Sequence, residues 1–307
     1  MLTPRSAMAM LLLAVAALGC GRSHGDRPRV ALVLKTLNSP FFLDMRRGAE
    51  AAAERVGVEL SVQAAEREID VEKQMQIIEN LIETGVRVLV ICPSGSKEIV
   101  PAVGKANRAG IPVIIVDDRI DEAAAAEARV RTDSYVGSDN VEGGRIAGRY
   151  LVAQSGGTSR VALLEGIPGH QTGDARLQGF REAIRGAPGI RIVASQTANW
   201  ERDQGFTVFQ NMLQAHSDID AVFACNDIMA LGAVEAIAAA GKTGRIRVIG
   251  FDAVDDARKA IATGAMAASV AQFPSEMGRL AVESAAKLLR GEPVPREQPT
   301  KVELVTR

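Results

Sequence analysis

Seven short segments of the chain place hydrogen-bonding or aromatic side chains directly after an apolar run that is typical of a buried strand. They are residues 35–42, 117–119, 169–174, 199–200, 226–227, 252 and 272. Carboxylates and amides can accept or share hydroxyl hydrogen bonds, Lys and Arg can donate them, and aromatic faces can cover the C–H face of a sugar ring. This mixture predicts a binding site for a neutral polyhydroxyl ligand.

Some of these side chains have an ordinary structural alternative. Asp and Asn after a strand often cap the next helix, so Asp227 and Asp252 remain open between capping and ligand binding. Phe41 and Phe42 could belong to the core at the start of a helix. Trp200 has polar neighbours on both sides, which favours stacking on a ligand over a core position.

Patterns for catalysis and metal binding are weak. His170 lies in a Gly-rich segment, but the chain has only 3 His, and His24 and His216 suggest no catalytic triad. A nucleotide-dependent dehydrogenase would carry G-x-G-x-x-G after its first strand, where this chain has Lys-Thr-Leu-Asn. We therefore expect a binding protein and not an enzyme, with no metal and no cofactor.

The elements that must position these side chains alternate between strands and helices. Strands are expected at residues 30–34, 58–62, 86–91, 113–116, 161–164, 192–195, 221–224, 247–251 and 268–271. Helices are expected at residues 41–56, 71–83, 98–109, 175–185, 205–215, 228–240, 255–263 and 276–289. This alternation predicts an α/β protein with parallel sheets, in which ligands bind beyond the carboxyl ends of the strands.

The two halves of the chain resemble each other. The segment Arg-Val-Ala-Leu at residues 29–32 recurs at residues 160–163, an offset of 160 − 29 = 131. The same offset or a slightly larger one pairs Gly48 with Gly179 and Asp117 with Asp252. A repeat of this length is about one domain. We therefore expect two similar Rossmann-like lobes that face each other across a cleft.

No low-complexity linker separates the halves, so we expect a hinge that the chain crosses several times. The N-terminal lobe is expected to comprise residues 29–137 and 273–299, and the C-terminal lobe residues 138–272 and 300–307. The predicted helix at residues 276–289 would carry the chain back to the first lobe.

The start of the chain is typical of an export signal. Residues 7–18 are apolar and uncharged, and the run is too short for a stable membrane span. Residues 17–20 resemble a bacterial lipobox, although Ala17 replaces the usual Leu, and ordinary signal-peptide cleavage is the alternative. We expect residues 1–20 to be a lipoprotein signal peptide with lipidation at Cys20, and residues 21–28 to be a tether. The protein would then lie in the periplasm or cell envelope.

Charge and cysteine content restrict the partners and the redox chemistry. The chain has 36 Lys and Arg against 37 Asp and Glu, so it shows no electrostatic footprint for nucleic acid. Cys92 and Cys225 each end an apolar run and lie in different halves, which favours buried free thiols over a disulfide.

The residues after the strands resemble those of type I periplasmic sugar-binding proteins of the ribose, allose and galactose group, the substrate-capturing components of ABC importers. The resemblance covers residues 29–307, and among its marks are Lys35-Thr36-Leu37, Pro40-Phe41-Phe42, Asn226-Asp227 and Val270-Ala271-Gln272. Lys35 and the acidic Asp174, where ribose binders carry Arg, make the chain most similar to D-allose-binding proteins.

The resemblance also implies which side chains contact a sugar. The aromatic residues would sandwich the ring, and the polar residues would bond its hydroxyl groups. The implied contacts are Lys35, Ser39, Phe41, Phe42, Asp117, Asp174, Arg176, Trp200, Asn226, Asp252 and Gln272. Ser39 stands where the family usually has Asn, and Asp118 where ribose binders have Arg, so the sugar itself stays open.

By resemblance, the protein would capture an allose- or ribose-like monosaccharide in the interlobe cleft and deliver it to an ABC permease. It would act as a monomer that touches the membrane only through its lipid anchor. A ligand sensor that feeds a chemoreceptor or a sensor kinase is the alternative. A transcriptional regulator with this fold would need a helix-turn-helix ahead of Val30, where the signal peptide lies instead.

Overall fold

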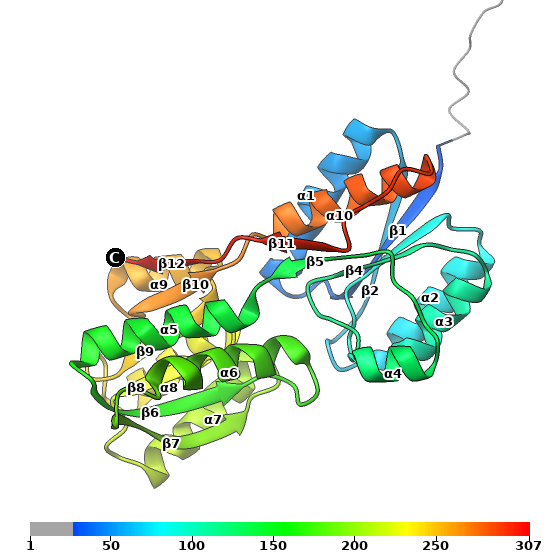
Figure 1. The fold of residues 1–307 in the computed structure, drawn as a ribbon. Helices are drawn as coiled ribbons and strands as arrows, with labels where there is room; N and C mark the ends of the chain where they lie inside the picture. Colours follow the sequence, from blue (N-terminus) through cyan, green and yellow to red (C-terminus); the bar gives the residue numbers. More distant parts are fainter. Residues whose placement is uncertain (1–26) are drawn as a thin grey trace, which may run out of the picture.

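Two six-stranded sheets, each covered by helices, form two lobes that lie next to each other (Figure 1). The structure is a computed structural model and describes residues 27–307. The predicted signal peptide, the lipidation site at Cys20 and most of the predicted tether lie outside the described residues. The predicted α/β fold class with two similar lobes is confirmed.

The first sheet has the strand order β11-β5-β4-β3-β1-β2, and all of its strands are parallel. Its strands are β1 (Arg29–Thr36), β2 (Glu59–Ala65), β3 (Val88–Ile91), β4 (Val113–Val116), β5 (Ser134–Ser138) and β11 (Glu297–Thr300). Its helices are α1 (Pro40–Val56), α2 (Val71–Glu83), α3 (Val100–Arg108), α4 (Glu122–Glu127) and α10 (Pro274–Leu289).

The second sheet repeats this order as β12-β10-β9-β8-β6-β7, and only β12 runs antiparallel to its neighbour. Its strands are β6 (Thr158–Glu165), β7 (Gly189–Thr197), β8 (Ala221–Ala224), β9 (Arg247–Asp252), β10 (Ala268–Ala271) and β12 (Glu303–Thr306). Its helices are α5 (Asn140–Ser155), α6 (Gln171–Ile184), α7 (Arg202–Ala215), α8 (Asp227–Ala239) and α9 (Asp255–Thr263).

Alternate residues of the central strands face opposite layers of helices. Val30, Leu32 and Leu34 of β1 pack in the core under α1 and α10, whereas Ala31 and Val33 pack under α2 and α3. A strand that is buried on both faces reads as a continuous apolar run, which is typical of parallel sheets. This explains why the apolar runs of β1 and β4 could be recognised as strands in the sequence.

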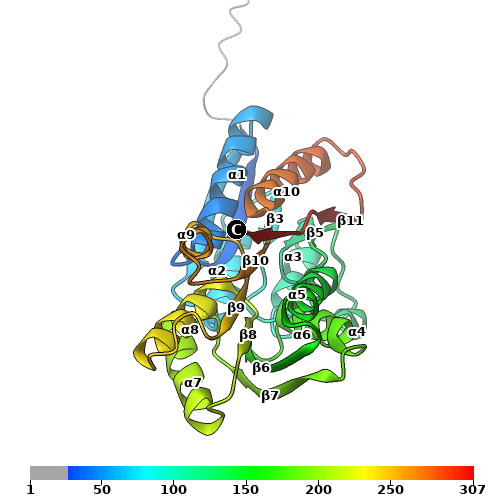
Figure 2. The same ribbon diagram turned by 90° about the vertical axis from the view of Figure 1, so that its left-hand side faces the viewer.

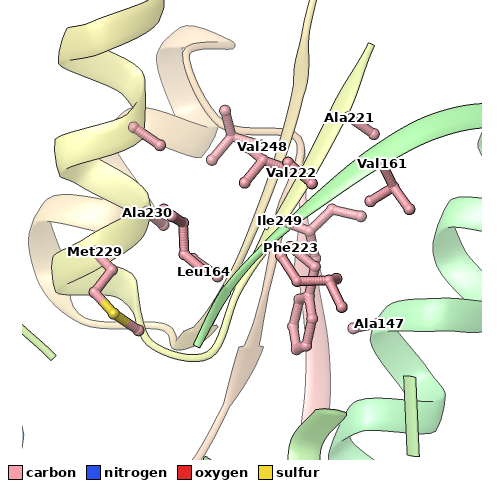
Figure 3. Close-up of a cluster of buried hydrophobic side chains, with 14 of the residues drawn as sticks. Ala147, Val161, Leu164, Ala221, Val222, Phe223, Met229, Ala230, Val248 and Ile249 are labelled. Carbon is pink, nitrogen blue, oxygen red and sulfur yellow. The ribbon is translucent and has the colours of Figure 1, made fainter. Parts of the chain in front are cut away.

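The core of the second lobe is built in the same way. Figure 3 shows Met229 and Ala230 of α8 on one side of strands β6, β8 and β9, and Ala147 of α5 on the other. Phe223 of β8 lies between the sheet and Ala147, and its ring stacks on Phe180 of α6 with centroids 4.6 Å apart. Each lobe therefore has its own hydrophobic core.

Glycine allows pairs of helices to approach closely, as Figure 2 shows for α1 beside α10 and for α5 beside α6. A Cβ atom on Gly48 would overlap the backbone of Ser275 at the start of α10. A Cβ atom on Gly179 of α6 would overlap the backbone of Val141 in α5, and one on Gly144 would overlap the backbone of Arg176. Gly48 and Gly179, which the sequence repeat pairs, therefore have the same packing role in the two lobes.

The chain passes from one sheet to the other after β5, after β10 and between β11 and β12. Ser138 pairs with Thr300 inside the first sheet, so this sheet extends one residue past the predicted lobe boundaries at 137 and 299. Helix α10 packs on α1, so it returns the chain to the first lobe as the sequence predicted.

Two further findings bear on the cellular setting. Cys92 and Cys225 are buried free thiols, as predicted. Within residues 27–307, no helix is both long enough and apolar enough to cross a bilayer.

Candidate ligand-binding site

A cavity lies between the two lobes, at the carboxyl ends of the strands of both sheets. It is lined by Lys35, Ser39, Phe41, Phe42, Glu68, Asp117, Thr172, Arg176, Trp200, Asn226, Asp252 and Gln272. All of the predicted contact residues except Asp174 are therefore brought together. The free space is about 30 Å3, room for one or two water molecules, so the side chains nearly fill the cavity in this arrangement of the lobes.

Lys35 forms a buried ion pair in the first lobe. Its Nζ lies 3.2 Å from Oδ2 of Asp118 and 3.7 Å from Oε2 of Glu68. Burial acts to lower the pKa of Lys35, but the surrounding acidic groups, Asp118 first, hold it above its ordinary value. The ammonium group is therefore charged and points its donors into a site that water barely reaches.

Three cavity residues have a strained backbone. The φ angles are +67° at Asp117, +66° at Trp200 and +110° at Asp252. Such conformations cost about 1–3 kcal/mol each for a residue other than glycine and occur mostly at functional sites. In Asp117 the strain is supported by two bonds to β5, because its N–H donates to Val136 and its carbonyl oxygen accepts from the Tyr135 hydroxyl.

Aromatic rings approach the cavity from both lobes. Phe41 and Phe42, in the first turn of α1, meet edge to face with centroids 5.3 Å apart. Both rings line the cavity and also belong to the core of the first lobe, so a core position does not keep these residues away from the cavity. Opposite them, the ring of Trp200 lies against Gly166 and Gly173, where any Cβ atom would approach or overlap the indole.

Arg176 of α6 is held rigidly beneath the cavity. Its Nε donates to Oδ1 of Asn140 at 2.8 Å, and its Nη1 donates to the carbonyl oxygen of Cys225 at 2.7 Å. The guanidinium lies 3.9 Å from the centroid of the Phe251 ring, and Nη1 is 3.9 Å from Oδ1 of Asp252. The side chain is therefore preorganised as a donor without needing a ligand to order it.

The hydrogen bonds of the acidic and amide residues show which of them cap a helix. Asn226 lines the cavity and also caps α8, because its Oδ1 accepts from the backbone N–H of Met229 at 2.9 Å. Asp252 caps no helix; its Oδ1 accepts from Nε2 of Gln272 at 2.7 Å. Asp227 lies behind the cavity, where it accepts bonds from Val254 and Ser269.

One polar atom of the cavity residues is left without a partner. Oε1 of Gln272 is buried and accepts no hydrogen bond within the described part of the chain. A buried acceptor of this kind costs free energy unless a donor reaches it. A ligand with hydroxyl groups would supply such a donor.

The carboxyl groups of the cavity resist ionisation because they are buried. Desolvation raises the pKa of Asp252 to about 7 against the opposing effect of Arg176, and it raises the pKa of Glu68 to about 7 against that of Lys35. The pKa of Asp117 is also raised, first by burial. The cavity is lined by these three carboxyl groups against two basic groups, Lys35 and Arg176, and burial makes each carboxyl group harder to ionise.

Hydrogen bonds join the lobes directly. The Thr172 backbone N–H and hydroxyl, from the second lobe, lie 3.3 and 3.4 Å from the carboxylate of Asp118 in the first lobe. Nε2 of His170 lies 2.7 Å from the carbonyl oxygen of Ser94. The structure is therefore a closed arrangement of the lobes.

Asp174 is the predicted contact that does not line the cavity in this arrangement of the lobes. It lies in the first turn of α6 but is exposed and does not line the cavity. Thr172 and Arg176 are four residues apart and share the face that points to the cavity, so Asp174 between them points elsewhere.

Two cavity residues, Glu68 and Thr172, were not among the predicted contacts. Glu68 follows β2, and the rule that ligands bind at carboxyl ends of strands would have included it had this loop been considered. Thr172 was part of the segment at residues 169–174, but its side chain could be placed only once the start of α6 was known.

Residues 27–307 contain no group of three or more His, Cys, Asp and Glu side chains arranged to hold a metal ion. His170 is instead surrounded by hydrogen-bonding partners from both lobes.

Comparison with known proteins agrees with this geometry. A family model described as "Periplasmic binding protein domain" matches residues 30–293. The chain is 38% identical over 278 residues to the ribose import binding protein RbsB of Escherichia coli (strain K12), covering 91% of this chain and 90% of that protein. It is 36% identical over 249 residues to the D-allose-binding periplasmic protein of the same organism, covering 81% and 80%.

A solved structure is similar over the same region. It is an ABC transporter periplasmic solute binding protein from Actinobacillus succinogenes 130z with bound D-allose, with a TM-score of 0.86 and 37% identity, covering 91% of this chain and 98% of that one. Both lobes of the present chain therefore have counterparts in a solute-binding protein. The chain belongs to the periplasmic binding protein family, as a two-lobed binding protein of type I and not an enzyme.

Proposed function

We propose that this protein binds a neutral monosaccharide similar to allose or ribose in the interlobe cavity and delivers it to an ABC permease. The observation that carries the proposal is the meeting of buried donors, acceptors and aromatic rings from both lobes in one cavity. The similarity to a ribose import binding protein and to a structure with bound D-allose supports the same ligand class.

Binding would proceed by hinge closure. A ligand that touches both lobes favours the closed state over the open one. Because the closed cavity leaves only about 30 Å3 free, a sugar must bind to a more open state, and side chains must adjust around it. We propose that the hinge lies where the chain passes between residues 29–137 plus 273–299 and residues 138–272 plus 300–307.

The proposed contacts can supply the required free energy. A micromolar dissociation constant corresponds to about −8 kcal/mol. Hydrogen bonds to charged groups contribute about 1.5–3 kcal/mol each. Four or five such bonds from Lys35, Arg176, Asp117 and Asp252, less the cost of closure and ordering, are sufficient.

We also propose that the protein is exported as a monomer and anchored through a lipid on Cys20. The apolar run at residues 7–18 and the lipobox-like residues 17–20 support this. Mass spectrometry of Cys20 in the membrane fraction tests it, with Cys20→Ala as the control that should release the protein. A wild-type protein found only in the soluble fraction, without a modified cysteine, would contradict the anchor.

The ligand is tested by a thermal-shift screen of pentoses, hexoses and polyols, followed by titration calorimetry of the hits. A sugar present at one hundred times its dissociation constant stabilises the folded state by about 2.7 kcal/mol. We expect D-allose or D-ribose to raise the melting temperature. If no sugar does so, the ligand class is wrong.

A further inference from the structure

His170 is buried between the lobes but is not one of the proposed sugar contacts. Its Nε2 lies 2.7 Å from the carbonyl oxygen of Ser94, in the first lobe. Its Nδ1 lies 3.2 Å from Nε1 of Trp200, in the second lobe, and 3.5 Å from Nζ of Lys35. The ring therefore contacts both lobes and the indole that lines the cavity.

These partners determine where the ring carries its proton. A carbonyl oxygen only accepts, so Nε2 must be the nitrogen that donates to Ser94. The indole N–H of Trp200 and the ammonium of Lys35 only donate, so Nδ1 must be the acceptor. The closed arrangement therefore requires a neutral His170, because a proton on Nδ1 would disrupt the contacts with both donors.

The charged groups around His170 come from three elements of the first lobe. Lys35 belongs to β1, Asp118 follows β4, and Glu68 follows β2 and contacts Lys35. Oδ2 of Asp118 is 3.7 Å from Nδ1 and favours a proton there, but this carboxylate is also bonded by Lys35 and Thr172. Burial and then Lys35 outweigh Asp118, and the pKa of His170 falls from 6.5 to about 4.

We propose that neutral His170 is a positioning residue that fastens the closed lobes through Ser94 and at the same time orients the indole of Trp200. Closure of the lobes would thereby fix the orientation of the Trp200 indole, the ring on which a sugar would stack. The stacking role rests on the proposed function, whereas the fastening of the lobes concerns the protein without ligand.

A dependence of closure on pH follows. When the lobes open, the ring meets water and returns towards its ordinary pKa, so the open state takes up a proton that the closed state excludes. Through His170, acid therefore favours opening, by up to about tenfold in the closed-to-open ratio per pH unit between 6.5 and about 4. Glu68 and Asp252, whose pKa values are raised by burial, act in the opposite direction.

Small-angle X-ray scattering of the purified protein without sugar, between pH 7.5 and pH 4.5, measures the closed fraction. His170→Ala removes both ring contacts, and we expect a closed-to-open ratio about tenfold lower at pH 7.5. His170→Gln can still donate to Ser94 but has no proton to gain, so its closed fraction relative to that of the wild type should increase as the pH falls. His216→Gln, at the end of α7, is the matched control and should behave as the wild type.

The comparison with His170→Gln is needed because other groups titrate in the same range. Glu68 and Asp252 have pKa values of about 7, so a pH effect in the wild type alone would not identify His170. Fluorescence gives a second readout, since Trp200 is the one tryptophan of the chain. His170→Ala should shift its emission to longer wavelength, whereas His216→Gln should not.

Three results would overturn the proposal. They are a wild type that is already open at pH 7.5, a closed fraction of His170→Ala equal to that of the wild type, and a pH profile of His170→Gln identical to that of the wild type. None of these measurements contains a sugar. The role of His170 can therefore be contradicted while the proposed ligand class stands. Equally, the ligand screen can contradict the ligand class while closure still depends on His170. If His170→Ala does not fold, the comparison with His170→Gln decides the question.

Discussion

Asp117 and Asp252 occupy equivalent positions of the two repeats, each at the end of a strand and each with positive φ. Both carboxyl groups are buried in the cavity and have a raised pKa. Neither is placed there by helix capping. Each lobe therefore has a strained turn at the same point of the repeat that places an acidic side chain in the cavity, and strain of this kind occurs mostly at functional sites.

Asp252→Asn should separate the contribution of Asp252 to ligand binding from its contribution to stability. Because burial raises the pKa of Asp252 from 3.8 to about 7, the folded protein holds a proton in this range that the unfolded chain releases, so this group lowers stability as pH rises from 3.8 to 7. We expect the variant to melt a few degrees higher than the wild type at pH 8 but not at pH 4. Its sugar affinity, measured by calorimetry at pH 8, should fall by about 30-fold.

Asp174→Asn is the matched control for this variant, since Asp174 is an exposed acid of the neighbouring helix α6. It should change neither the melting temperature nor the affinity appreciably. An Asp252→Asn protein that binds sugar as tightly as the wild type would remove Asp252 from the site. A lower melting temperature at pH 8 would show that its carboxylate stabilises the fold.

Trp200 should report binding directly. The chain has 1 Trp, and its ring lines the cavity, so a bound sugar should change the intrinsic fluorescence. Trp200→Phe should abolish this signal and weaken binding by about tenfold, because a smaller ring covers less of the sugar face. A ligand that binds by calorimetry but leaves the fluorescence of the wild type unchanged would argue against stacking on Trp200.

At the scale of elements, the apolar runs and helical spacing located most of the fold. The bounds of α2, β4, β8, α9 and β10 agree with the predicted ranges to the residue. These elements have strong signals, such as four consecutive apolar residues in β4 and β8. The paired Gly48 and Gly179 were also recognised from the repeat, although their role in helix packing required coordinates.

The segment at residues 120–157 was left without assigned elements because its signals are weak. The strand β5 reads Ser-Tyr-Val-Gly-Ser, which is short and contains polar residues and a glycine. The helix α5 has two adjacent glycines, Gly143 and Gly144, that lower its helix propensity. Close packing on α6 and Phe251 requires these glycines, so tertiary contacts override the local preference.

Gly144→Ala should therefore affect both stability and binding. The added methyl group would overlap the backbone of Arg176, and overpacking of this kind costs about 1–3 kcal/mol. Because Arg176 lines the cavity, the displacement should also lower sugar affinity. Gly186→Ala is the matched control, since no atom lies within 4 Å of the place that a Cβ atom on Gly186 would occupy. Chemical denaturation and calorimetry measure the two effects, and equal stability of the two variants would contradict the close helix contact.

At the scale of the molecule, the cavity exists only because two lobes contribute to it. The positions after the strands and the family resemblance together predicted ten of its twelve lining residues, and Arg176 among them came from the resemblance alone. It could not predict how far the lobes close, which depends on contacts such as Thr172 with Asp118 that join segments distant in the chain.

The charge of the closed cavity should select against acidic sugars. Three carboxyl groups, on Glu68, Asp117 and Asp252, face two cations, Lys35 and Arg176, which are already engaged by other protein groups. An added carboxylate would be desolvated without a free counterion. In a thermal-shift screen we expect neutral sugars to raise the melting temperature and uronic acids not to. A uronic acid as the sole hit would contradict this charge balance.

The last residues of the chain complete both sheets, since β11 pairs at the edge of the first and β12 at the edge of the second (Figure 1). One short segment, residues 297–306, therefore supplies an edge strand to each lobe, and neither six-stranded sheet is complete without it. Loss of the final ten residues, 298–307, would leave two incomplete domains instead of shortening one.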